Sequence, residues 1–147
     1  MDAKVDKRLK TAAIAILAVS IAVYIVYITL CKSAHTAFGG VGSAPPEALM
    51  RAYGAASAAA NGALSIGLIL LWIRNCSGGI WKTFLRCIAA AAVTLVLCGA
   101  AELLIGNPYY PNLPSVLLFL FGRWLGCVIL CAVAAAVTAF IARQARR

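Results

Sequence analysis

The sequence predicts an all-α membrane protein, a four-transmembrane-helix bundle with both termini cytoplasmic. Three observations lead to this prediction. Hydrophobic residues make up 64% of the 147 residues, well above the roughly 45–50% that is usual in soluble domains. They are gathered into long runs, and most of the basic residues lie in alternate segments between those runs. We therefore expect a single membrane domain that comprises residues 1–147.

The apolar runs comprise residues 11–31, 52–73, 87–105 and 116–141. A helix rises about 1.5 Å per residue, so about 20 apolar residues are needed to cross the roughly 30 Å of hydrocarbon in a bilayer. Each run is close to that length or longer. A helix in water would also carry a polar face, and these runs contain too few polar residues to form one. The lipid bilayer is therefore the expected surrounding of most of the chain.

The first run follows a basic segment that contains Lys4, Lys7 and Lys10, so the opening of the chain shares features with a secretory signal. The run 11–31 is longer than the roughly 7–15 residues of a signal core, and no clear small-residue cleavage site follows it. We expect a retained first span. Tyr24 lies in the second half of this run. We expect its side chain to lie in a polar interior of the helix bundle.

The other spans carry polar residues at a helical spacing of four. The second has Ser57, Asn61 and Ser65, the third has Thr94, Cys98 and Glu102, and the fourth has Arg123, Cys127 and Cys131. Residues four apart lie on one face of a helix. Because polar side chains are costly in lipid, we expect these faces to point to the interior of the bundle.

Glu102 and Arg123 are the only charged residues inside the predicted spans. Glu102 lies just before the outer end of the third span, and Arg123 lies somewhat deeper in the fourth. Their depths differ by about 5 Å, which the long stem of an arginine covers. We predict an ion pair between them, with Asn61 and Tyr24 as hydrogen-bonding neighbours.

The sequence leaves three roles open for this polar cluster. The pair can be a structural clamp that fixes the register of the helices. It can line a solvated pocket that opens outward, where Glu102 binds a proton or a cation, or Arg123 binds an anion. In the third case the charged side chains simply reach toward the lipid headgroups.

Two spans also carry faces of small residues, which let helix backbones approach one another closely in membranes. The second span has Gly54, Ala58 and Gly62, and the fourth has Gly122 and Gly126. We expect these faces to pack helices together, either within the bundle or between copies of the chain. A homo-oligomer and a complex with another membrane protein both fit this pattern.

The net charge of +9 predicts an orientation in the membrane and not a nucleic-acid partner. Basic residues near the ends of spans are retained on the cytoplasmic side. Both tails and the second connection share one side of a four-span chain, and they hold Lys4, Lys7, Arg8, Lys10, Arg74, Lys82, Arg86, Arg143, Arg146 and Arg147. The other side has Lys32 and Arg51. We expect a multi-pass protein of a plasma or inner membrane with both ends cytoplasmic.

The six cysteines do not form a pattern typical of redox or metal chemistry. Cys127 and Cys131 are one helical turn apart, unlike the Cys-x-x-Cys of disulfide exchangers, and the surroundings of His35 lack the ligand spacing of a zinc site. Cysteine is a small residue that packs well in protein interiors. We expect structural cysteines, no cofactor and no bound metal.

The sequence contains no motif that names a function. We expect a small non-enzymatic subunit or accessory protein of a membrane complex, because the loops and tails are short and no nucleophile lies beside a plausible base. The alternative is a small oligomeric transporter or channel that uses a polar cavity around Glu102 and Arg123. A third alternative is a membrane enzyme that acts on lipid or thiol substrates.

Overall fold

The protein forms long helices in a computed structural model that describes residues 3–38, 47–108 and 110–145. The helices are α1 (Ala3–Phe38), α2 (Glu47–Asn75), α3 (Ile80–Ile105) and α4 (Leu113–Gln144), and a short 3-10 turn, η1 (Cys76–Gly78), follows α2. Each of the four α-helices is long and apolar enough to cross a membrane. The predicted all-α fold with four such helices is therefore confirmed.

The helices extend beyond the predicted apolar runs. Lys32 and Arg51, expected in the first connection, lie in α1 and α2, and Arg74, expected in the second connection, lies in the last turn of α2. Hydropathy marks where polar residues begin, but long polar side chains are good helix formers and prolong a helix past the hydrocarbon. Arg146 and Arg147, which we counted for the orientation, lie outside the described residues.

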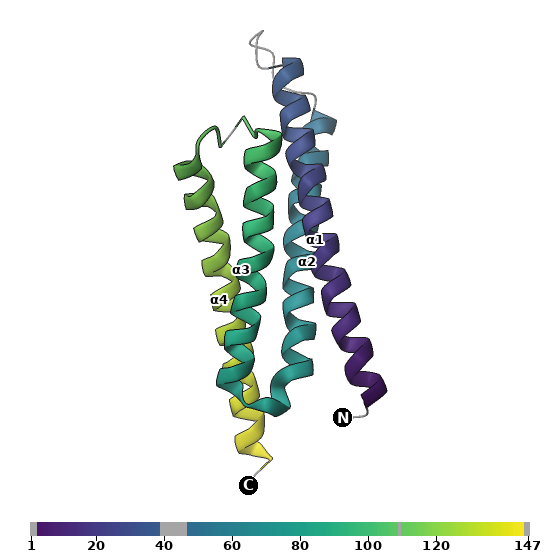
Figure 1. Cartoon of the computed structure of the whole chain (residues 1–147), viewed down its shortest axis with the longest axis vertical. Coiled ribbons are helices and arrows are strands. Elements are labelled where there is room, and N and C mark those ends of the chain that lie inside the picture. The colour runs from purple at the N-terminus through teal and green to yellow at the C-terminus, as the bar shows by residue number, and fades with distance from the viewer. Residues whose placement is uncertain (1–2, 39–46, 109, 146–147) are drawn as a thin grey trace.

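The helices are arranged as two antiparallel pairs. α1 packs along α2 and α3 packs along α4, while contacts between the two pairs are less extensive. Figure 1 shows the start of α1, the connection from α2 to α3 and the end of α4 at one end of the bundle, which we call the termini end. The connection from α3 to α4 lies at the opposite end, which we call the loop end. Consequently α2 and α4 both run from the loop end to the termini end.

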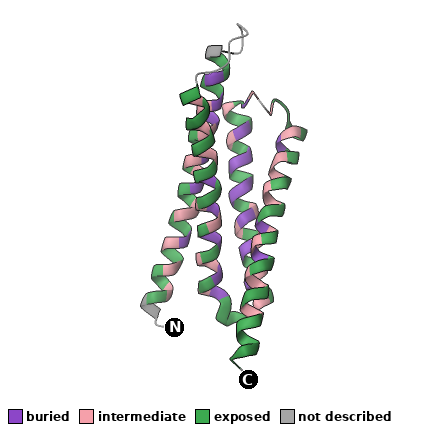
Figure 2. Ribbon diagram, turned by 180° about the vertical axis from the view of Figure 1, so that it is seen from behind, coloured by how far each residue is buried: buried purple, intermediate pink, exposed green. Residues whose placement is uncertain are grey.

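Apolar side chains cover the outside of the bundle. Figure 2 shows exposed residues along much of every helix, and among them Leu104 and Leu118 are 87% and 74% exposed. Apolar patches as extensive as this are rare on soluble monomers. Lipid tails are as apolar as leucine side chains and can surround them without cost. The surface therefore suits hydrocarbon surroundings.

The interior has one cluster toward each end of the bundle. Trp72 and Cys87 belong to the cluster nearer the termini end, and Tyr24 and Cys98 belong to the one nearer the loop end. Trp72 Nε1 also donates a hydrogen bond to Thr138 Oγ1 at 3.0 Å, which links α2 to α4. All six cysteines lie in described parts of the chain, where five are buried and none forms a disulfide.

Two glycines allow close contact within the helix pairs. A Cβ atom at Gly67 would lie 2.7 Å from Leu17 Cδ2, and one at Gly99 would lie 2.5 Å from Leu120 Cδ1. Real side chains do not approach one another this closely, so only glycine fits in these positions without a shift of the leucines. Gly67 brings α1 against α2, and Gly99 brings α4 against α3.

The predicted small-residue faces lie on the outside of the bundle. The residues concerned, all exposed, are Gly54, Ala58, Gly62, Gly122 and Gly126. A Cβ atom at any of the four glycines would have no heavy atom within 4 Å other than those of its chain neighbours and the nearby backbone of its own helix. Within the described chain these glycines therefore touch no neighbouring helix, and the helix pairs meet through other faces. Packing between copies or on a partner stays a prediction.

Capping groups at the loop end set the positions of the two intramembrane charges. Gly106 ends α3 with a φ of 78°, and its N–H donates to the carbonyl of Glu102 at 3.0 Å. A left-handed residue at this position is usually glycine. Asn112 begins α4, since its Oδ1 accepts a hydrogen bond from the N–H of Ser115 at 3.0 Å. Glu102 thus lies in the last turn of α3, and Arg123 lies several turns into α4.

Candidate intramembrane polar site

The structure brings together four predicted site residues, one from each α-helix. Tyr24 comes from α1, Asn61 from α2, Glu102 from α3 and Arg123 from α4. Two hydrogen bonds and one cation–π contact connect them in the order Glu102, Tyr24, Arg123 and Asn61. We call these four residues the polar cluster. It ties the two helix pairs together in the half of the bundle nearer the loop end.

Glu102 is the most deeply buried charged residue of the described chain, with 1% of its surface exposed. Its Oε1 accepts a hydrogen bond from the hydroxyl of Tyr24, which is also 1% exposed. Its Oε2 is buried and has no hydrogen-bond partner. A buried carboxyl oxygen without a hydrogen-bond partner is costly.

Arg123 lies on the other side of Tyr24. Its Nη2 donates a hydrogen bond to Asn61 Oδ1 at 2.5 Å. Its Cζ is 4.5 Å from the centroid of the Tyr24 ring and 5.7 Å from that of Phe119. Both distances are within the range of a cation–π attraction. The aromatic rings and one amide oxygen therefore stabilise the guanidinium, while its Nε and Nη1 are buried without a hydrogen-bond partner.

The predicted ion pair between Glu102 and Arg123 does not form. Within the described residues, the ion pairs are Arg51 with Glu47 at 2.5 Å and Arg74 with Asp6 at 2.9 Å. The prediction compared the depths of the two charges along their helices, and depth does not specify what lies between the helices. Tyr24 of α1 occupies that place, where its hydroxyl contacts the carboxylate and its ring contacts the guanidinium.

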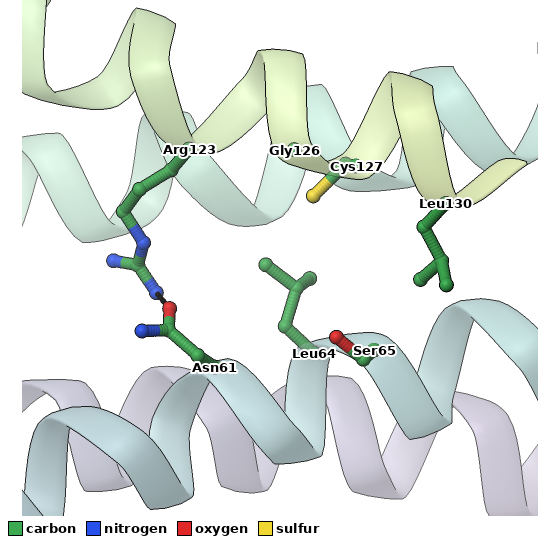
Figure 3. A pocket seen from close by; sticks show the side chains of 7 residues that line it. All are labelled: Asn61, Leu64, Ser65, Arg123, Gly126, Cys127 and Leu130. Carbon is green, nitrogen blue, oxygen red and sulfur yellow. Dashed lines mark hydrogen bonds between the residues drawn. The ribbon is translucent and has the colours of Figure 1, made fainter.

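A groove opens between α2 and α4 beside Arg123. It encloses about 310 Å³ and is lined by Asn61, Leu64, Ser65, Arg123, Gly126, Cys127 and Leu130. Figure 3 shows the Arg123 and Asn61 side chains meeting across one end of the groove, with Leu64 and Leu130 pointing into the space beyond them. Because α2 and α4 run in the same direction, this space extends from the polar cluster toward the termini end.

The polar faces predicted for the spans behave differently. On α3 and α4 the residues Thr94, Cys98, Cys127 and Cys131 are buried, as the spacing predicts. On α2 the corresponding face is only partly covered, since Asn61 is exposed beside the groove. Few residues of α2 and α4 contact each other. This face of α2 therefore lies along a cleft and not in the core.

Sequence reasoning missed Phe119 and Leu64 as neighbours of the polar cluster. Phe119 precedes Arg123 by one helical turn, and this spacing was a usable signal for a contact between the two side chains. Leu64 is one leucine among many in an apolar run, and nothing in the sequence distinguishes it. Ser20 was also not assigned a partner, although its Oγ donates to the carbonyl of Ala60 at 2.8 Å and joins α1 to α2.

Comparisons with known proteins found no matching protein-family model, no matching curated protein and no matching solved structure. The chemistry of the site therefore rests on its own geometry. The polar cluster offers a carboxyl group that can hold a proton and a guanidinium that can bind an anion.

Proposed function

We propose that this protein is a small non-enzymatic subunit or accessory protein of a membrane complex, whose partner packs on the outward small-residue faces of α2 and α4. The observation that supports this proposal is the open space around Gly54, Gly62 and Gly122. Glycine inside a helix lowers the stability of the helix by about 1 kcal/mol relative to alanine. These glycines allow no close contact between helices of their own chain. A second helix that approaches this side would use the space they leave.

Photo-cross-linking in native membranes tests this proposal. A photoreactive phenylalanine analogue at Ala58, on the small-residue face of α2, should form an adduct with the partner. The matched control carries the same analogue at Leu104, which is also exposed but lies on α3. Gly62→Leu should remove the Ala58 adduct by filling the face. A protein that yields no adduct at Ala58 and has the mass of one chain in mild detergent would contradict the proposal.

The proposed orientation places the termini end in the cytoplasm. Cys76, in η1 at that end, is the one exposed cysteine among the six. A membrane-impermeant maleimide should therefore label the protein only after the cells are permeabilised, and Cys76→Ser should remove the label. Labelling of Cys76 in intact cells would reverse the orientation.

A second candidate is a proton-coupled transporter or channel, and the observation that favours it is the buried Oε2 of Glu102, which has no hydrogen-bond partner. Proteoliposomes that contain an internal pH-sensitive dye test this candidate. Under an imposed pH gradient, the native protein should acidify the lumen faster than the Glu102→Gln variant. Equal rates for the native protein, the variant and empty liposomes would reject it.

A further inference from the structure

The groove between α2 and α4 has one polar end and one apolar end. Asn61 and Arg123 form the polar end. Beyond them, Leu64, Gly126 and Leu130 line a mostly apolar space. A molecule that fits such a groove has a polar head and an apolar tail, because each part then meets groups of its own kind.

The guanidinium of Arg123 at the polar end forms no ion pair with an acidic residue of the described chain. Asp6 pairs with Arg74, Glu47 pairs with Arg51, and Glu102 accepts a hydrogen bond from Tyr24. Asp6 and Glu47 are thus paired with other arginines, and Glu102 is separated from Arg123 by Tyr24. An anion that contacts Arg123 directly would therefore come from outside the described chain.

The donors of Arg123 also lack acceptors. Its Nε and Nη1 are buried without a hydrogen-bond partner, and buried donors of this kind are costly. A guanidinium presents its N–H groups as a planar fork that matches the oxygens of a carboxylate. The Arg123 side chain lines the groove together with Asn61, whose amide supplies a further donor.

We propose that this groove binds a long-chain carboxylic acid of the fatty-acid type, with its carboxylate on Arg123 and Asn61 and its chain along Leu64, Gly126 and Leu130. The volume of 310 Å³ is near the lower end of the roughly 300–1,000 Å³ of small-molecule sites. This volume suits a single acyl chain and not the paired chains of a phospholipid. The inference does not depend on the proposed partner protein, because the small-residue faces lie mainly on the loop-end side of the groove.

Binding of radiolabelled oleate to the purified full-length protein in detergent tests this inference. Arg123→Gln should weaken oleate binding by at least about tenfold, because a charge-assisted bidentate contact is lost. Gly126→Leu should weaken it similarly by filling the groove while leaving Arg123 in place. The matched controls are Arg51→Gln, which removes a different arginine, and Gly122→Leu, which fills a position one turn away. Both should bind oleate within about twofold of the native protein.

Competition on the native protein separates the possible ligands and does not depend on the folding of any variant. Unlabelled oleate should displace the label, and oleyl alcohol should not, because it lacks the carboxylate. Displacement by oleyl alcohol at the same concentration, or unchanged oleate binding by both Arg123→Gln and Gly126→Leu, would overturn the proposal. Stronger displacement by dioleoyl phosphatidylglycerol would also overturn it and identify a phospholipid site. Failure of oleate to bind would also overturn the proposal. If a photoreactive group at Leu130 then captures a protein helix, the groove is a protein interface. The Ala58 adducts test the proposed partner separately.

Discussion

The hydroxyl of Tyr24 donates a hydrogen bond to Oε1 of Glu102, although the two residues are 78 positions apart in the chain. Both side chains are almost completely buried. The bond joins α1 of one helix pair to α3 of the other. It also fixes the Tyr24 ring in the place where Arg123 contacts its face. One tyrosine therefore separates the two intramembrane charges and connects each of them to the rest of the bundle.

Tyr24→Phe should destabilise the protein by about 1–3 kcal/mol, because the carboxyl group of Glu102 loses its hydrogen-bond donor and stays buried. Thermal unfolding in detergent, followed by circular dichroism, measures the change. Tyr53→Phe on α2 is the matched control, since it removes the same hydroxyl from a residue outside the polar cluster, and its effect should stay within about 0.5 kcal/mol. Equal effects of the two substitutions would show that the hydrogen bond contributes nothing specific.

Gly99→Leu should destabilise the bundle by about 1–3 kcal/mol through overpacking. A Cβ atom there would lie 2.5 Å from Leu120 Cδ1, so Leu120 would have to move, and the remaining atoms of the new leucine would crowd the contact between α3 and α4. Gly62→Leu should leave the unfolding temperature of the isolated chain unchanged or raise it, because a Cβ atom at Gly62 has no other heavy atom within 4 Å. Thermal unfolding of the two variants side by side checks the contrast, and a larger loss for Gly62→Leu would contradict it.

Trp72→Phe should cost about 0.5–1.5 kcal/mol beyond the small change in packing, because Thr138 loses its hydrogen-bond donor. The bond of 3.0 Å from Trp72 Nε1 is one of the few links between α2 and α4. Trp81→Phe is a suitable control, since Trp81 is 69% exposed. The measurement is the midpoint of unfolding in a denaturing detergent, and the prediction fails if both tryptophan variants shift this midpoint equally.

Asp6→Asn should weaken the contact between the start of α1 and the end of α2, but only slightly. The Asp6 carboxylate accepts from Nε and Nη2 of Arg74 at 2.9 and 3.2 Å, and both side chains are partly exposed. Ion pairs of this kind contribute about 0.2–1 kcal/mol and are screened by salt. The difference in unfolding temperature between the native protein and the variant should therefore shrink in about 1 M salt. A difference that persists at high salt would indicate a packing effect.

The sequence predicted the members of the polar cluster and the hydrogen-bonding roles of Tyr24 and Asn61, but the predicted ion pair is absent. Tyr24, Asn61, Glu102 and Arg123 stand out in the sequence because polar groups are costly in lipid. The helical rise gives their approximate depth, but it does not say which side chains lie between them. Tyr24 lies between the two charges, where its hydroxyl contacts Glu102 and its ring contacts Arg123. Arg123 donates a hydrogen bond to Asn61. These contacts replace the expected ion pair.

The sequence alone was sufficient to predict the helical class and the number of apolar helices, because the thickness of a bilayer imposes a length and a composition on each span. Only the tertiary structure decided which glycines bring helices together. Gly67 and Gly99 do so, while the more conspicuous Gly54, Gly62 and Gly122 face outward. The physical reason is that hydropathy is a property of each segment by itself, whereas the rotation of a helix about its axis depends on the side chains of its neighbours.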